Sequence, residues 1–234
     1  VVFDLKTQFS ARCAPDNFTS DDGCYSPDNY DHKFRGPVTF KNALAQSLNI
    51  PAVKALYLAG IDESLKTARD LGLTTLTNRD QYGLTLVLGG GEVKLLEMVG
   101  AYGAFANEGE RAELTGILRI EDNQGNVLQE TEPKLSRVLD RDITLQISDI
   151  LSDNVARTPL FGANSALYFP GRDVAAKTGT TNDKRDAWVV GYTPNLVVGA
   201  WAGNNDNTSM NEISGLIITP LWREFMDVAL EKIP

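Results

Sequence analysis

The sequence predicts an α/β fold of the α+β type, in which a sheet is sandwiched by helices. Three short strand candidates lie close together in the chain, at residues 174–179, 187–192 and 196–203. Helical spacing of apolar residues precedes this cluster, and the clearest amphipathic helix follows it. Helices before and after clustered strands favour a layered domain whose apolar faces pack together. The length and composition of the chain fit one large domain or two small ones.

The elements can be justified in chain order. Residues 1–37 are expected to be mainly loop, because they contain three prolines and little periodicity. The triple glycine at 89–91 lacks the Gly-Lys-Ser/Thr ending of a phosphate-binding loop, so we interpret it as a connector. Trp222, Phe225, Met226 and Leu230 recur at helical spacing and predict a helix near the C-terminus. Further helices are expected at residues 39–47, 51–60, 62–71, 94–107 and 140–155, and a hairpin at 117–128.

Composition excludes several functions. The net charge of −9 argues against a nucleic-acid partner, because phosphate binding needs clustered Lys and Arg. No apolar run approaches the roughly 18 residues that a membrane span needs. The chain begins at Val1 without a signal-peptide pattern, so any targeting segment is expected outside it. His32 is the only histidine, and the zinc motif H-E-x-x-H is absent, so no metal or cofactor is expected.

The two cysteines lie close together in a polar stretch. Cys13 and Cys24 are separated mainly by Asp, Ser, Asn and Gly. Such a pair forms a disulfide in an oxidising compartment and remains two free thiols in a reducing one. The sequence leaves both alternatives open.

Two short motifs carry the chemistry. Ser47, Leu48 and Asn49 lie at a break between two expected helices. Lys177, Thr178, Gly179, Thr180 and Thr181 end an expected strand. Each motif alone is weak, and a strand that ends in Lys-Thr-Gly is also compatible with a simple polar exit into a turn. Together and in this order they match two of the three motifs of the serine acyl-transferases that react with penicillin.

The residues around both motifs resemble the penicillin-binding transpeptidases of the bifunctional type, which carry a glycosyltransferase domain upstream. The resemblance runs in register from about Asp4 to the last helix and is carried by residues 25–30, 36–39, 43–54, 101–109, 177–183, 185–188 and 191–194. It implies an antiparallel sheet sandwiched by helices, as in serine β-lactamases and penicillin-binding transpeptidases. It also implies that residues 1–234 form one transpeptidase domain, incomplete at the N-terminus.

The resemblance also implies an activity and a role for each motif residue. Members of the family are peptidoglycan D,D-transpeptidases, which cross-link stem peptides through a serine acyl-enzyme and bind β-lactam antibiotics. Ser47 would relay protons, Asn49 would hold the acyl-side amide, and Lys177 would add positive charge. Thr178, Gly179, Thr180 and Thr181 would bind the substrate, with the Thr180 N–H as one of two oxyanion donors.

One departure from the family is clear: no serine is followed by lysine three positions later, so the S-x-x-K motif of the nucleophile is absent. We expect it in an upstream part of the same protein, on the extracytoplasmic face of a bacterial membrane and anchored by a segment outside this chain. The alternatives are a non-catalytic relative and part of a β-lactamase or β-lactam sensor. For a transpeptidase, we expect the Lys177 strand to be an inner strand of the antiparallel sheet, with the loop of residues 47–49 facing it. Ser47 and Lys177 should then be close enough for a hydrogen bond or one bridging water.

Overall fold

A computed structural model of the chain describes residues 1–181, 184–210 and 213–233. The helices are α1 Phe40–Ala45, α2 Asn49–Ala59, α3 Ile61–Asp70, α4 Leu95–Ala106, α5 Arg141–Ser152, α6 Asn154–Phe161 and α7 Gly215–Lys232, with 3-10 turns at Arg79–Gln81 and Leu84–Leu88. The strands are β1 Val2–Asp4, β2 Gly36–Val38, β3 Glu110–Ala112, β4 Arg119–Glu121, β5 Val127–Glu130, β6 Leu135–Arg137, β7 Ala175–Thr180, β8 Asp186–Thr193 and β9 Leu196–Gly203.

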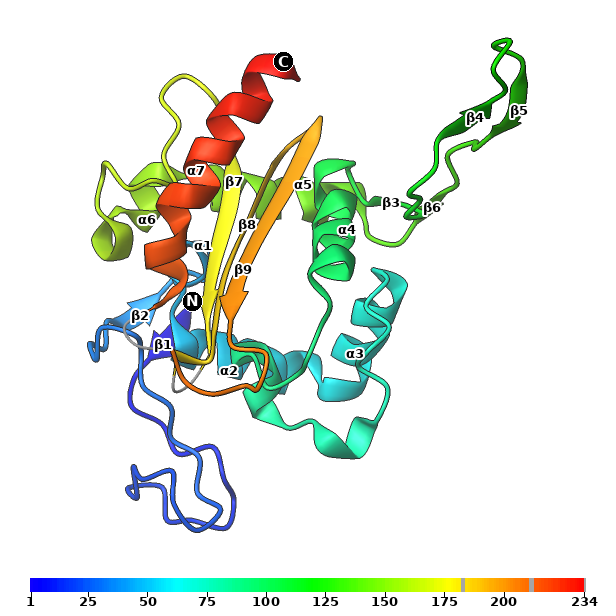
Figure 1. Cartoon of the computed structure of the whole chain (residues 1–234). Helices are drawn as coiled ribbons and strands as arrows, with labels where there is room; N and C mark the ends of the chain where they lie inside the picture. Colours follow the sequence, from blue (N-terminus) through cyan, green and yellow to red (C-terminus); the bar gives the residue numbers. More distant parts are fainter. Residues whose placement is uncertain (182–183, 211–212, 234) are drawn as a thin grey trace.

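The centre of the molecule is an antiparallel sheet in the order β7-β8-β9. Helix α7 crosses one face of this sheet, and α4 and α5 lie against the other (Figure 1). Strand residues alternate between the two faces, so Trp222 of α7 packs with Val189 while Tyr102 of α4 packs with Tyr192. The predicted sheet sandwiched by helices is therefore confirmed.

The face covered by α7 holds the larger apolar core. Trp222 and Met226 are fully buried there, and the Trp222 indole donates a 3.0 Å hydrogen bond to the Val198 carbonyl. Gly191 of β8 lies directly under the ring, since a Cβ at that position would be 2.4 Å from Trp222 Cζ2. The helix therefore approaches the sheet closely because a glycine faces its largest side chain.

Residues 1–37 are mainly loop, as expected. The sequence did not predict the two short strands at the ends of this segment, β1 and β2, which pair antiparallel with Val2 opposite Val38. The strands are three residues long and lie far apart in the sequence, so neither shows a recognisable alternation. Pro37 is compatible with this pairing because the two-stranded ribbon has only edge strands.

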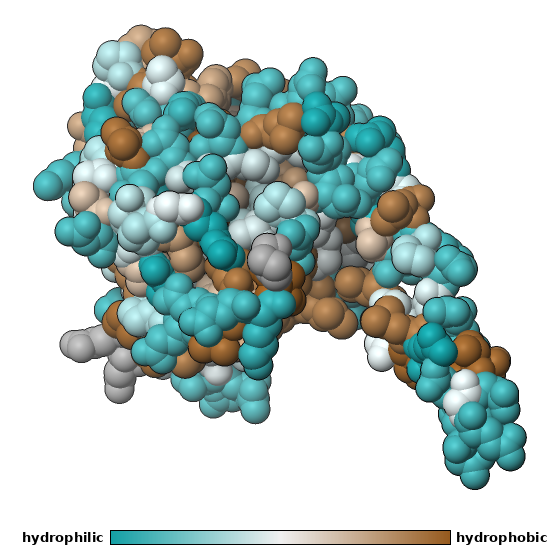
Figure 2. Space-filling model, turned by 90° about the horizontal axis from the view of Figure 1, so that it is seen from above, coloured by the Kyte–Doolittle hydropathy of each residue, from teal (hydrophilic) through white to brown (hydrophobic). Residues whose placement is uncertain are grey.

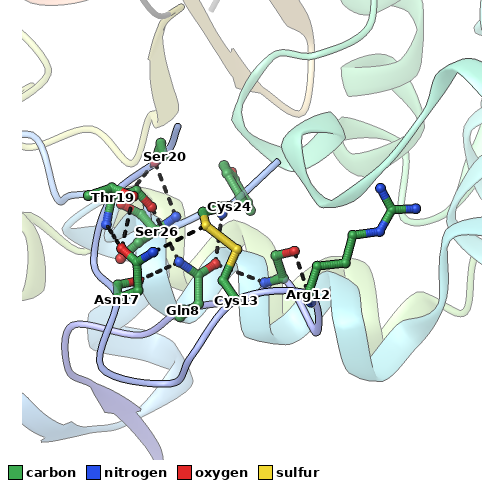
Figure 3. The surroundings of a disulfide bond; sticks show 10 residues. Gln8, Arg12, Cys13, Asn17, Thr19, Ser20, Cys24 and Ser26 are labelled. Carbon is green, nitrogen blue, oxygen red and sulfur yellow. Dashed lines mark hydrogen bonds between the residues drawn. A yellow bond between two sulfur atoms is a disulfide. The ribbon is translucent and has the colours of Figure 1, made fainter. Parts of the chain in front are cut away.

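A disulfide joins Cys13 to Cys24 in the loop between β1 and β2, with their Cα atoms 5.7 Å apart. Of the two alternatives, the structure thus has the disulfide. The Gln8 side chain lies beside it and accepts hydrogen bonds from the backbone N–H groups of Ser10 and Tyr25 (Figure 3). The loop is therefore organised by one covalent bond and by hydrogen bonds to the side-chain amides of Gln8 and Asn17.

Residues 113–134 form an arm that projects from the body of the molecule (Figure 2). Its tip is the β4–β5 hairpin that the sequence predicts, displaced by about two residues, and the side chains of both strands are exposed. Within the described residues, no helix is long and apolar enough to cross a membrane.

Candidate active site

The two sequence motifs meet in the structure. The Lys177 ammonium donates a 2.6 Å hydrogen bond to Ser47 Oγ, although the residues are 130 positions apart, and a 2.7 Å bond to the Thr178 carbonyl. Burial lowers the pKa of Lys177 to about 8, and the positive charge of Arg157 contributes to the same shift. The geometry therefore places an amine that titrates near neutral pH against a hydroxyl group.

Ser47 occupies a strained turn at the end of α1. Its φ is +54°, in the left-handed region that glycine usually fills. The Ser47 N–H bonds to the Leu44 carbonyl and the Leu48 N–H to the Ala43 carbonyl, which is the hydrogen-bond pattern of a Schellman motif. A serine at this position costs about 1 kcal/mol relative to glycine. In return, the turn directs a hydroxyl toward Lys177.

Asn49 begins α2 beside the loop of residues 26–35. Its backbone N–H donates a 2.9 Å hydrogen bond to Asn29 Oδ1, and its side-chain nitrogen donates a 2.7 Å bond to the Asp28 carbonyl. In the described part of the chain, Asn49 is therefore hydrogen-bonded to this loop, whereas Ser47 is hydrogen-bonded to Lys177. The structure brings all of the 47–49 motif to one end of α2, and within the described part of the chain Ser47 is the motif residue with a hydrogen bond to the lysine.

The remaining motif residues divide between the two faces of β7. Lys177 and Gly179 share the face of α4 and α5, whereas Thr178 and Thr180 point to the face of α7. Thr180 Oγ1 accepts a 3.0 Å hydrogen bond from the Gly215 N–H at the start of α7. The first turn of α7 is therefore tied to Thr180, one of the residues for which the resemblance implies a role in substrate binding.

Strand β7 is an edge strand in the described part of the chain, so the expectation of an inner strand is wrong. The reason is the order of the sheet: β8 pairs with both β7 and β9, which leaves the other side of β7 open. The Thr181 N–H bonds to the Asp186 carbonyl of β8. Because ladder bonds alternate along an antiparallel pair, the Thr180 N–H points to the open side.

Thr181 closes the end of this strand. Its hydroxyl bonds to the Asp186 carboxylate at 3.1 Å and accepts a 2.9 Å bond from the Asp186 N–H. Gly89 lies against it, since a Cβ there would be 2.9 Å from Thr181 Cγ2. The triple glycine at 89–91 is a connector, as expected, but it also borders the site. Asn182 and Asp183, which follow in the resembling segment, lie outside the described residues.

Arg157 is a buried cation near the site that the sequence did not single out. It is 2% exposed, and its guanidinium donates to the carbonyls of Leu151 and Leu167. Leu151 packs with Ala175 and Leu167 with Ala176, the residues that precede Lys177 on β7. Arginine side chains are rarely fully buried, and Arg157 belongs to no recognisable motif, so nothing in the sequence signals this burial.

This arrangement can move a proton and present backbone donors. A neutral Lys177 amine can accept the proton of Ser47, and a charged one can return it. Within 1–181, 184–210 and 213–233, no cluster of three or more His, Cys, Asp or Glu side chains is arranged to hold a metal.

Comparisons with known proteins show the family and the fold of the chain. The family model for the penicillin-binding protein transpeptidase domain matches residues 5–227. Penicillin-binding protein 1A of Aquifex aeolicus is 37% identical over 210 residues, which cover 89% of this chain and 28% of that protein. Penicillin-binding protein 2D of Bacillus subtilis is 33% identical over 217 residues, covering 90% of this chain and 30% of that one. The chain thus spans less than a third of the length of these curated relatives.

A solved structure has the same fold. The crystal structure of penicillin-binding protein 1A from Haemophilus influenzae superposes with a TM-score of 0.82 at 25% sequence identity. The match covers 100% of this chain and 39% of that one. The structure of PonA1 from Mycobacterium tuberculosis in complex with penicillin V superposes with a TM-score of 0.74 at 22% identity, covering 89% of this chain and 61% of that one.

Proposed function

The chain belongs to the penicillin-binding protein transpeptidase family, and we propose that it supplies the Ser-x-Asn and Lys-Thr-Gly part of a serine D,D-transpeptidase site. The observation that carries the proposal is the 2.6 Å hydrogen bond between Lys177 and Ser47. Two motifs of an acyl-transferase family, far apart in the sequence, share one contact, and the lysine titrates where proton transfer is useful.

The proposed reaction is the cross-linking of peptidoglycan stem peptides. A serine hydroxyl attacks the carbonyl of the penultimate D-Ala, the peptide bond breaks, and the terminal D-Ala leaves with the transferred proton. The acyl group is then an ester on the serine. An amine of a second stem peptide attacks this ester, forms the cross-link and restores the hydroxyl.

Residues of this chain would serve the steps other than the attack itself. Ser47 and Lys177 relay the proton to the leaving amine, and Asn49 holds the amide on the acyl side. The Thr180 N–H is one oxyanion donor at the open side of β7, and Thr178, Gly179 and Thr181 shape the strand along which the extended peptide lies. Loss of one oxyanion donor typically lowers the rate about 10²–10³-fold.

The nucleophile would come from an S-x-x-K segment, because the sequence given has no serine with a lysine three positions later. We place that segment, and a glycosyltransferase domain, in the upstream part of the same protein. The Cys13–Cys24 disulfide supports a location outside the cytoplasmic membrane, where such bonds persist. β-Lactams are expected to bind because their strained carbonyl occupies the place of the peptide carbonyl.

The test is intact-mass measurement after incubation with a fluorescent penicillin. The chain alone should gain no stable adduct, and a longer protein that carries S-x-x-K should gain one adduct on the serine of that motif. In the longer protein, Lys177→Ala should lower the acylation rate on the order of 10²–10³-fold, because the members of such a site act as a unit.

Two outcomes contradict the proposal. Stoichiometric labelling of the isolated chain at a mapped serine would show that the nucleophile is misplaced. A longer protein that folds and binds penicillin without any adduct would favour the non-catalytic alternative. Ser152→Ala is the matched control, since this half-buried serine of α5 bonds within its own helix and its loss should leave acylation unchanged.

A further inference from the structure

A buried polar pair lies behind the Ser-x-Asn motif. Asp4, at the end of β1, is 0% exposed, and Asn29 is 2% exposed. The Asn29 side-chain nitrogen donates to both Asp4 carboxylate oxygens, at 2.8 and 2.9 Å, and to the Lys33 carbonyl at 2.7 Å. The Arg35 N–H donates a further 3.0 Å bond to Asp4. The Asn29 amide is therefore fixed in one orientation, with its oxygen directed away from Asp4.

That oxygen caps α2 from outside the helix. Asn29 Oδ1 accepts hydrogen bonds from the N–H groups of Asn49 at 2.9 Å and Ile50 at 3.4 Å. The residue at the usual capping position, Leu48, has no side-chain oxygen to offer. The first N–H groups of a helix lack partners within the helix, so a side chain 20 positions earlier takes this role.

The cap is continuous with the turn that holds Ser47. The N–H groups of Ser47 and Leu48 bond back to α1, and the next two bond to Asn29. The left-handed turn is thus held from α1 on one side and from Asn29 on the other. Because that turn sets the direction of Ser47 Oγ, a shift of the start of α2 changes its distance from Lys177.

We propose that Asp4 and Asn29 form a positioning pair that orients Ser47 and Asn49 for the reaction. The significance for catalysis rests on the proposed function, whereas the positioning itself concerns only this chain. Neither residue is proposed to act on Lys177 directly; both influence the position of Ser47 through the first turn of α2. Lys54 of α2 supports the same placement, since its ammonium donates a 2.7 Å bond to the Phe3 carbonyl of β1.

The first test compares NMR signals of isotope-labelled variants of this chain. In Asn29→Ala, the amide signals of residues 47–50 and the Lys177 Nζ signal should shift, because the cap is lost. The double swap Asp4→Asn with Asn29→Asp keeps an acceptor for α2 and reverses the donor within the pair, so it should restore these signals. Asp31→Asn is the matched control: it breaks the 2.8 Å ion pair with Arg35 in the same loop without touching α2.

Unchanged signals of Ser47 and Lys177 in a folded Asn29→Ala variant would overturn the proposal. If Asn29→Ala does not fold, the double swap decides: a folded swap that keeps the Ser47–Lys177 contact supports positioning, and a folded swap that loses it refutes positioning.

The second test measures acylation in a longer protein that carries S-x-x-K. Asn29→Ala should lower the acylation rate on the order of 10²-fold, with a smaller change in the affinity for the unreacted β-lactam, because a misplacement of about 1 Å has this effect. An unchanged acylation rate would overturn the catalytic significance of the pair. If the parent protein itself is not acylated, the proposed function fails, and the NMR comparison still decides whether the pair positions Ser47.

Discussion

The two sides of the site are held by different interactions. Lys177 lies in a regular strand whose neighbours Ala176 and Val189 belong to the apolar core around Trp222. Ser47 lies in a strained turn whose following residues are capped by the buried amide of Asn29. Many apolar contacts stabilise the position of Lys177, and a few directional hydrogen bonds stabilise the position of Ser47.

This difference has a consequence for mutations. Apolar contacts are shared among many residues, so their loss lowers the stability of the whole domain while the strand keeps its path. A directional hydrogen bond has one partner, so its loss changes one turn and leaves a buried group unsatisfied. The lysine side should therefore respond to mutation through stability and the serine side through geometry.

The largest expected effect tests the apolar side. Trp222→Ala should lower the free energy of unfolding by about 3–5 kcal/mol, because it leaves a cavity over Gly191. Urea denaturation measures this change. Leu221→Ala is the control on the same helix, where the side chain is 69% exposed, and it should change the value by less than about 0.5 kcal/mol. Equal effects of the two variants would contradict a core centred on Trp222.

The next effect is the pH dependence of stability that Lys177 introduces. Its pKa is about 8 in the folded chain against 10.5 for an ordinary lysine, so the unfolded state binds more protons between these values. The parent should therefore gain roughly 1–3 kcal/mol of stability relative to Lys177→Met as the pH rises through this window. Urea denaturation of both proteins at pH 7 and at pH 10 measures the difference. A difference that is independent of pH would show that the lysine is not held with a lowered pKa.

A smaller effect separates the two causes of that pKa. Arg157→Met removes the neighbouring positive charge but not the burial, so the pKa of Lys177 should rise while it stays below 10.5. Titration of the Lys177 Nζ signal by NMR measures it. Arg172→Met is the matched control, because Arg172 also donates to a backbone carbonyl, that of Leu230, and does not contribute to the shift. An identical titration in parent and Arg157→Met would assign the whole shift to burial.

The smallest effect tests the strained side. Ser47→Gly should have a free energy of unfolding roughly 1 kcal/mol higher than Ser47→Ala, because glycine adopts the left-handed conformation without a Cβ penalty. Both variants lose the hydroxyl that accepts the Lys177 hydrogen bond, so the comparison isolates the backbone conformation. Thermal denaturation of both variants measures the difference. Should glycine be no more stable than alanine here, the turn would not be strained in the way that its φ indicates.

The sequence could predict the contact at the centre of the site. The 47–49 and 177–181 motifs resemble those of a family whose fold joins them, and the short, mostly apolar runs within residues 174–203 are clear enough to place three strands. The expected contact between Ser47 and Lys177 is confirmed at 2.6 Å. The roles of Asn49, Thr178, Gly179, Thr180 and Thr181 in binding substrate stay predictions.

The rest depended on tertiary contacts that leave no local pattern. Asp4 and Asn29 are polar residues without a recognisable motif, and only the folded chain shows that both are buried. Arg157 is hidden for the same reason. The prediction of an inner position for β7 was wrong because strand order depends on which strands pair in the folded sheet. The residues of a single strand do not show whether it has one neighbour or two.

The Cys13–Cys24 disulfide also determines whether cleavage of its loop by a protease can be detected by gel electrophoresis. The two cysteines are 11 positions apart in a loop whose residues are largely exposed. A single cleavage between them leaves both halves of the polypeptide covalently joined, so a nicked molecule keeps its mobility on a non-reducing gel. After reduction, the same sample releases an N-terminal peptide that carries β1, and with it Asp4. Damage to the loop therefore stays hidden in a standard purity check until a reductant is added.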